Sequence, residues 1–253
     1  MRFKYTLPAI ALLASTTIQA QQSLPQKSWF TSFQITDVEH ISKNAYGLSS
    51  QYYFSPQDSS GTLDDWGYID TDSNVSFDYA HFGSSNPVSV GGEYFADKFI
   101  VLGILSHRNG DNTGTAGFGY LFNDNLKTLV IYNEDTEDTY LKAQYQHDLN
   151  STDYLGFTAS TDVEFDNMGI SARYFALVNN GDHVAVNILY SDNEYNDYWS
   201  GGAKYYFGQQ YSLGLGAIDS EVWVEADYFF SDEYYVTFNY LDNTYQLALT
   251  AQF

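Results

Sequence analysis

The sequence predicts an all-β fold, a transmembrane antiparallel β-barrel of 16 strands, with 14 or 12 strands left open as alternatives. The chain of 253 residues holds 24 tyrosines and 18 phenylalanines but only four prolines, an inventory that favours strands. Apolar and polar residues alternate in short segments that are separated by turn residues. The polar side of several segments is charged, which suits a watery interior better than a protein core.

Alternating segments follow one another along the whole chain. Near the C-terminus, Val222 and Val224 alternate with Glu221, Trp223 and Glu225. Residues 98–107 hardly alternate, and strand boundaries read from sequence are uncertain by about two to four residues, so the strand count stays open. Nine strands are expected near residues 28–37, 45–54, 73–82, 87–95, 98–107, 114–122, 126–133, 138–147 and 153–162, and seven more that start near 167, 182, 198, 210, 221, 234 and 244.

Connections between these segments are rich in Asn, Asp and Gly, as at residues 109–111, 123–125, 179–182 and 241–243. The longest connection, residues 55–72, is rich in Ser, Asp and Gly and carries Trp66 and Tyr68. Two interpretations stay open for it: a constriction or plug lying across the mouth of the barrel, or an ordinary long loop.

Both ends of the chain suggest export. Arg2 and Lys4 precede an apolar stretch over residues 7–18, and Ala20 offers a small residue for cleavage, so we expect a signal peptide over residues 1–20 and one barrel domain over 21–253. There is no cysteine, and no disulfide is expected. The last strand places a set of apolar residues on one face: Tyr245, Leu247, Leu249, Ala251 and Phe253.

This ending resembles the terminal strand of bacterial outer-membrane β-barrels, whose closing aromatic residue is read by the barrel-assembly machinery. The resemblance implies that the five apolar residues form an assembly signal. Residues 55–72, with Ser73 and Asn74 after them, look like the corresponding segment of proteobacterial general porins. That resemblance implies a Gram-negative outer-membrane porin, a water-filled channel for passive diffusion of small hydrophilic solutes and ions. It further implies contact with outer-membrane lipid and lipopolysaccharide, and a homotrimer.

Charge restricts the partners. The net charge is −22, with 32 acidic and 10 basic residues, and the predicted leader contains two of the basic ones. Such a surface excludes nucleic acid as a partner and excludes docking on anionic lipid through a polybasic patch. An acidic lumen also predicts a preference for cations.

If the strand register is as predicted, acidic and basic residues line the pore on facing walls. Two interpretations stay open: the opposed charges create a transverse electric field at a constriction, or they are solvated charges in a wide lumen. The pore-lining candidates are Asp78, Glu93, Lys142, Arg173, Lys204, Glu225 and Asp227.

Enzymatic chemistry is not expected, and neither is a cofactor, a metal site or a catalytic residue. Residues 106–110 resemble the His-x-Ser-Asn-Gly stretch of outer-membrane phospholipases, but Asn109 stands at the nucleophile position. Ser106 and His107, neighbours on a strand, would point to opposite faces. Three alternatives to a general porin stay open. They are a sugar- or nucleoside-selective channel with an aromatic track of Trp223, Tyr206 and Phe229, a non-conducting structural barrel of about 8 to 10 strands, and a soluble β-sandwich.

Overall fold

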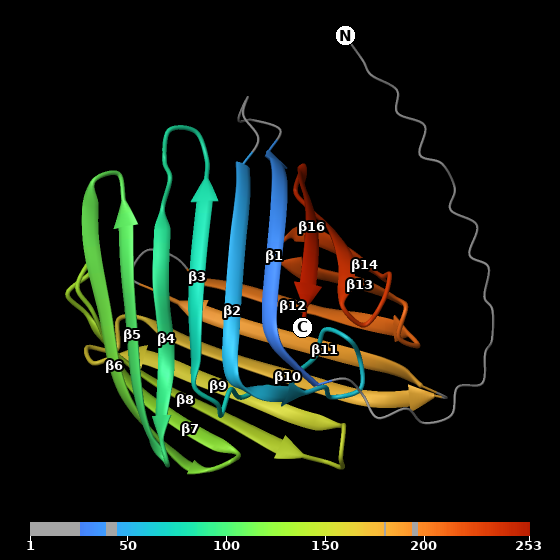
Figure 1. The fold of residues 1–253 in the computed structure, drawn as a ribbon, viewed down its shortest axis with the longest axis horizontal. Coiled ribbons are helices and arrows are strands. Elements are labelled where there is room, and N and C mark those ends of the chain that lie inside the picture. The colour runs from blue at the N-terminus through green and yellow to red at the C-terminus, as the bar shows by residue number, and fades with distance from the viewer. Residues whose placement is uncertain (1–25, 39–44, 180, 194–196) are drawn as a thin grey trace.

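The computed structural model describes residues 26–38, 45–179, 181–193 and 197–253, so the predicted leader lies outside the described residues. The described chain forms one antiparallel sheet of 16 strands that closes into a barrel (Figure 1). No helix in this part of the chain is long and apolar enough to cross a membrane. The strands are β1 (Gln26–Val38), β2 (Ala45–Asp58), β3 (Asn74–His81), β4 (Val88–Ala96), β5 (Phe99–Arg108), β6 (Asp111–Asn123), β7 (Leu126–Asn133), β8 (Thr139–Asp148), β9 (Tyr154–Asp162), β10 (Met168–Asn179), β11 (Asp182–Asp192), β12 (Asp197–Phe207), β13 (Tyr211–Ile218), β14 (Glu221–Phe229), β15 (Tyr234–Leu241) and β16 (Thr244–Gln252).

The predicted fold and the count of 16 strands are confirmed. The β-sandwich interpretation is wrong, because a single sheet closes on itself where β1 pairs with β16, with Phe30 opposite Gln252. Closure leaves no free strand edge, which is the condition for a sheet to span lipid. β2 runs to Asp58, beyond the expected end at residue 54, so the long connection covers residues 59–73.

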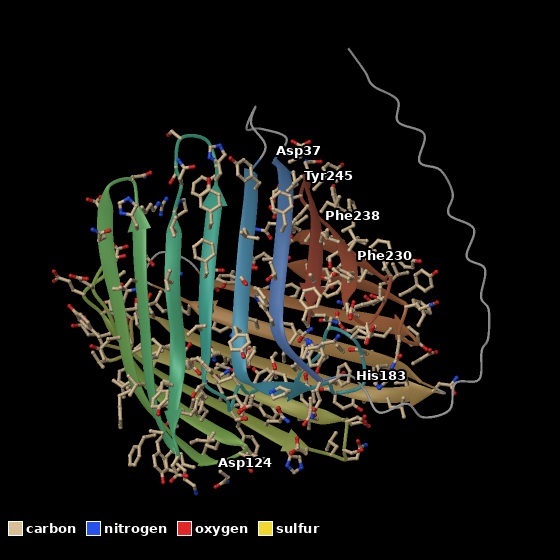
Figure 2. The ribbon with its side chains drawn as sticks, in the orientation of Figure 1. Asp37, Asp124, His183, Phe230, Phe238 and Tyr245 are labelled. Carbon is tan, nitrogen blue, oxygen red and sulfur yellow. The ribbon has the colours of Figure 1, made fainter. Side chains whose placement is uncertain are left out.

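The outer face of the barrel is apolar. Where β1 meets β16, Phe33 lies opposite Leu249 and Ile35 opposite Leu247. These four side chains are 43–52% exposed, and Figure 2 shows many others standing out from the strands. A continuous apolar surface of this kind would be unusual in water and is typical of a wall that faces lipid.

The C-terminal residue closes the barrel through its backbone. Phe253 N donates a hydrogen bond to Trp29 O (2.8 Å), and Phe253 O accepts from Ser28 N (2.6 Å) and Trp29 N (2.9 Å). The Phe253 ring packs edge-on against Tyr234, with 5.7 Å between centroids. The ring and its apolar partners on β16 lie on the outer face, while Gln252 is fully buried on the inner face.

β5 alternates poorly in the sequence because both of its faces are apolar. Ile100 points inward and is fully buried in a cluster with Leu121 of β6 and Leu129 of β7. Phe95 and Ile131 pack against this cluster. One stretch of the inner wall is therefore a small hydrophobic core, which explains the absence of a polar face in residues 98–107.

Candidate functional site

Residues 59–73, called the lumen segment below, connect β2 to β3 and fold into the barrel. They start at the end of the barrel where β1 begins and β16 ends, called the terminal end. In Figure 1 the teal chain that follows β2 lies beside the C-terminus, and the Gln252 side chain donates to Leu63 O (2.8 Å). The segment also contacts β7, β8, β9, β10 and β12. It is therefore not a loop that projects away from the barrel.

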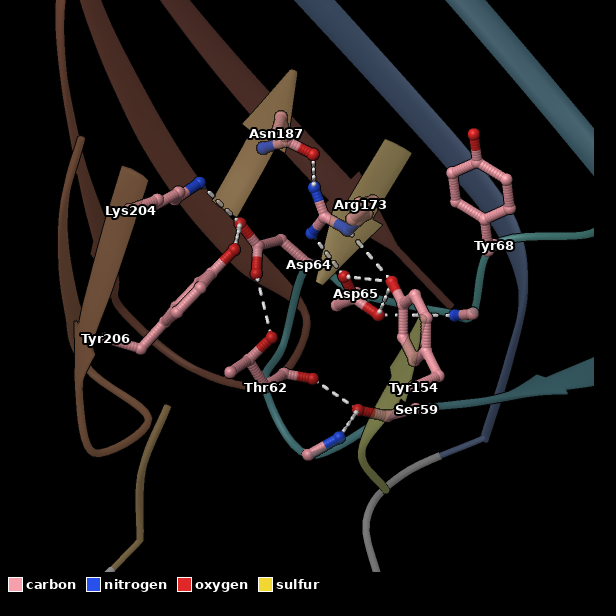
Figure 3. Close-up of polar contacts among 12 residues, drawn as sticks. Ser59, Thr62, Asp64, Asp65, Tyr68, Tyr154, Arg173, Asn187, Lys204 and Tyr206 are labelled. Carbon is pink, nitrogen blue, oxygen red and sulfur yellow. Dashed lines mark hydrogen bonds and ion pairs between the residues drawn. The ribbon is translucent and has the colours of Figure 1, made fainter. Parts of the chain in front are cut away.

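Asp65 is the most enclosed attachment point of the lumen segment. Asp65 is 4% exposed, and its carboxylate forms an ion pair with Arg173 of β10 and accepts a hydrogen bond from the Tyr154 hydroxyl at both oxygens (3.0 Å each) (Figure 3). Arg173 also donates from Nε to Tyr154 Oη (2.9 Å) and from Nη1 to Asn187 Oδ1 (2.9 Å). Charge-assisted hydrogen bonds thus surround a buried carboxylate, the arrangement that such a group requires.

Asp64 forms an ion pair with Lys204 of β12, and the same ammonium group contacts two further carboxylates. Lys204 Nζ lies 2.7 Å from Asp64 Oδ2, 2.6 Å from Glu225 Oε1 and 2.6 Å from Asp227 Oδ2. Thr62 Oγ1 donates to the other Asp64 oxygen (3.0 Å). One ammonium among three carboxylates leaves the group as a whole negative.

Asp70 attaches the opposite side of the lumen segment. The Tyr53 hydroxyl of β2 donates to Asp70 Oδ1 (3.0 Å), and Lys127 Nζ of β7 donates to the Asp70 carbonyl (3.3 Å). Lys127 also forms an ion pair with Glu93 of β4. The segment is thereby attached to strands on both sides of the interior.

Tyr68 rests on the wall formed by β9 and β10. Its hydroxyl lies 2.8 Å from Thr158 Oγ1 and 3.2 Å from Ser171 Oγ, and its backbone N donates to Gln146 Oε1 (2.8 Å). The ring covers Gly156 so closely that a Cβ at that position would stand 2.3 Å from Tyr68 Cγ. Only glycine leaves room for this contact.

A Gly156→Ala variant should therefore loosen the lumen segment, because the methyl group and the Tyr68 ring cannot both keep their places. Overpacking of this kind costs about 1–3 kcal/mol, and we expect faster hydrogen exchange in residues 59–73. Gly103→Ala is the matched control, since a Cβ there meets no atom within 4 Å. Equal exchange in both variants would contradict the packing role of Gly156.

The structure brings most of the predicted pore-lining residues together at the lumen segment. Arg173 pairs with Asp65, Glu93 pairs with Lys127, and Lys204 joins Glu225 and Asp227. The acidic and basic residues thus form local ion pairs, most of them with or beside the segment. Two candidates make no ion pair within the described part of the chain: Lys142 on β8, which lies near the pair formed by Lys127 and Glu93, and Asp78 on β3.

Sequence reasoning missed Asp64, Asp65, Lys127 and Tyr154. The available signal was the Asp64-Asp65 pair in a long connection of a chain whose few basic residues are predicted to face inward. The proposed aromatic track is wrong for two of its three members, because Tyr206 and Phe229 are 2% and 3% exposed and offer no ring face to a solute. Trp223 lies over Gly202, Gly214 and Gly216.

Comparison with known proteins gives one family. Residues 6–253 match the family model described as "Putative general bacterial porin". The outer membrane protein Omp33 of Acinetobacter baumannii aligns with 92% of this chain and 100% of its own at 20% identity and a TM-score of 0.63. A triple mutant of the Rhodopseudomonas blastica porin aligns with 89% of this chain and 99% of its own at 12% identity and a TM-score of 0.55. These two structures share the fold. No curated protein matches the chain.

Proposed function

Because the chain belongs to the general bacterial porin family, we propose that this outer-membrane channel protein lets small hydrophilic solutes and ions diffuse passively and prefers cations. The main observation that supports this proposal is the closed barrel of 16 strands. Barrels of about eight strands are filled by their own side chains, whereas about 16 strands leave room for an aqueous channel. The lumen segment narrows this channel at the terminal end.

The charges inside the barrel support the preference for cations. Arg173 is matched by Asp65 and Lys127 by Glu93, while Lys204 is outnumbered by its three carboxylates. Asp78 and Lys142, neither of which has an ion-pair partner among the described residues, offset each other, so the excess of negative charge comes from the carboxylates around Lys204. Such a lumen raises the local concentration of cations.

The proposed partners lie around the barrel. Outer-membrane lipid and lipopolysaccharide would cover the apolar outer face, and the assembly machinery would read the outward residues of β16 that end at Phe253. A homotrimer is proposed from the porin resemblance. Family and fold both point to a channel rather than an enzyme, and the proposal contains no chemical step, cofactor or nucleic acid.

Single-channel recording tests the proposal directly. We expect the mature protein to give stable open steps in a planar bilayer, and a KCl gradient to make the dilute side positive, since cations cross faster than anions. The alternative of a narrow structural barrel with about 8 to 10 strands is wrong, because the barrel has 16, and protein that inserts without conducting would contradict the proposed channel. A negative dilute side would overturn the cation preference.

A further inference from the structure

A cavity of about 460 Å³ lies between the lumen segment and the wall made by β1, β2, β3, β15 and β16. Asp64 and Trp66 line it from the segment, and Ser32, Ser49, Asp78 and Thr250 are among its wall residues. The small hydroxyl side chains of this wall leave the space open. Its size falls within the range of about 300–1,000 Å³ that is usual for small-molecule sites.

Asp78 gives the cavity its charge. The side chain is exposed to the lumen and stands in register between Ser49 of β2 and Ser89 of β4. Among the described residues it has no ion-pair partner, and the lining includes no lysine or arginine. Asp64, by contrast, is already paired with Lys204. The cavity therefore holds one carboxylate whose charge is uncompensated.

Aromatic rings line the same cavity. Trp66 packs edge-on against Phe30, with 5.2 Å between ring centroids, and both residues line the space. Tyr53 and Tyr235 line it as well. Aromatic faces attract organic cations, tryptophan most strongly, and a carboxylate attracts the same charge.

We propose that this cavity binds a small organic cation, a substituted ammonium whose charge faces Asp78 and whose alkyl groups contact Trp66. The proposal rests on the proposed function and names the solute class that the channel retains. A hydrated Ca²⁺ or Mg²⁺ would pair with the Asp78 carboxylate through its waters but would make no alkyl contact with Trp66. A neutral sugar would use the hydroxyls and the rings but would gain nothing from the unpaired charge.

Choline and its neutral isostere 3,3-dimethylbutan-1-ol have the same shape and differ in charge, so they distinguish binding of a cation from binding of a neutral solute. We expect choline to block the KCl current through the wild-type channel in a concentration-dependent way and the isostere to leave it unchanged. Asp78→Asn and Trp66→Leu should each raise the half-blocking choline concentration about tenfold. Asp37→Asn is the matched control, because it removes the same charge from an outward-facing side chain at the end of β1 that lies opposite the terminal end of the barrel (Figure 2).

Equal block of the wild type and Asp78→Asn would overturn the proposal, and so would equal block by choline and the isostere. Intrinsic tryptophan fluorescence of the folded protein in detergent reads binding without any current. Choline should change the emission of the wild type and leave that of Trp66→Leu constant. If choline changes the fluorescence but no current is recorded in the bilayer, only the proposed channel function is contradicted. If a current is recorded but choline does not block it, only the cation site is contradicted.

Discussion

Replacing residues 60–71 with about six glycine and serine residues is expected to raise the single-channel conductance by a factor of about two or more. The replaced residues include Asp64, Asp65 and Asp70, through which the lumen segment is attached to both sides of the interior. Without them the barrel keeps its strand ladder, while the passage at the terminal end widens.

The same replacement should shift the reversal potential toward anions. Arg173 loses its carboxylate partner, and Lys204 loses one of three. Removal of residues 135–137, an exposed turn at the opposite end that also carries two acidic residues, is the control and should change the conductance little. An unchanged conductance after replacement of the lumen segment would show that the segment does not limit the current.

Substituting Arg173 with methionine is expected to release the lumen segment. The change leaves the Asp65 carboxylate buried without a cation, a loss that costs about 3–5 kcal/mol when one partner of a buried pair is removed. Because the 16-strand ladder does not depend on this pair, the cost should appear as local opening. We expect hydrogen-exchange protection of residues 59–73 to fall by a factor of about 100 or more, with a much smaller change in barrel melting.

The double variant Arg173→Met with Asp65→Asn completes the test. The neutral amide can still accept the Tyr154 hydroxyl, so part of the lost protection should return. Protection in the double variant no better than in Arg173→Met alone would mean that the guanidinium supports the segment through Asn187 and Tyr154 rather than through the charge of Asp65.

Strands were predictable because each one carries its own signal. Alternation along residues 221–229 needs no knowledge of the neighbouring strands, and β14 begins and ends there. In β5 this signal is weaker, because the inward-facing residue Ile100 is apolar and packs against Leu121 of β6 and Leu129 of β7. The strand count was still correct because the turn residues at 109–111 marked the end of β5.

The direction of the lumen segment could not be read in this way. A connection rich in Asp and Gly is compatible with a loop in water, and the Asp64-Asp65 pair alone does not specify an inward course. The deciding contacts lie far along the chain: Asp65 meets Arg173 108 residues later, and Asp64 meets Lys204 140 residues later. Pairings at such separations depend on barrel closure, which local patterns do not encode.

This separation has a consequence for the order of folding. The lumen segment follows the second strand, yet its partner Gln252 lies on the last strand, 189 residues beyond Leu63. Since β1 meets β16 only when the sheet closes, the complete set of attachments exists only in the finished barrel. Docking of the segment is therefore completed late in biogenesis, when β16 joins β1. The time at which residues 59–73 become fully resistant to protease would report when the new barrel closes.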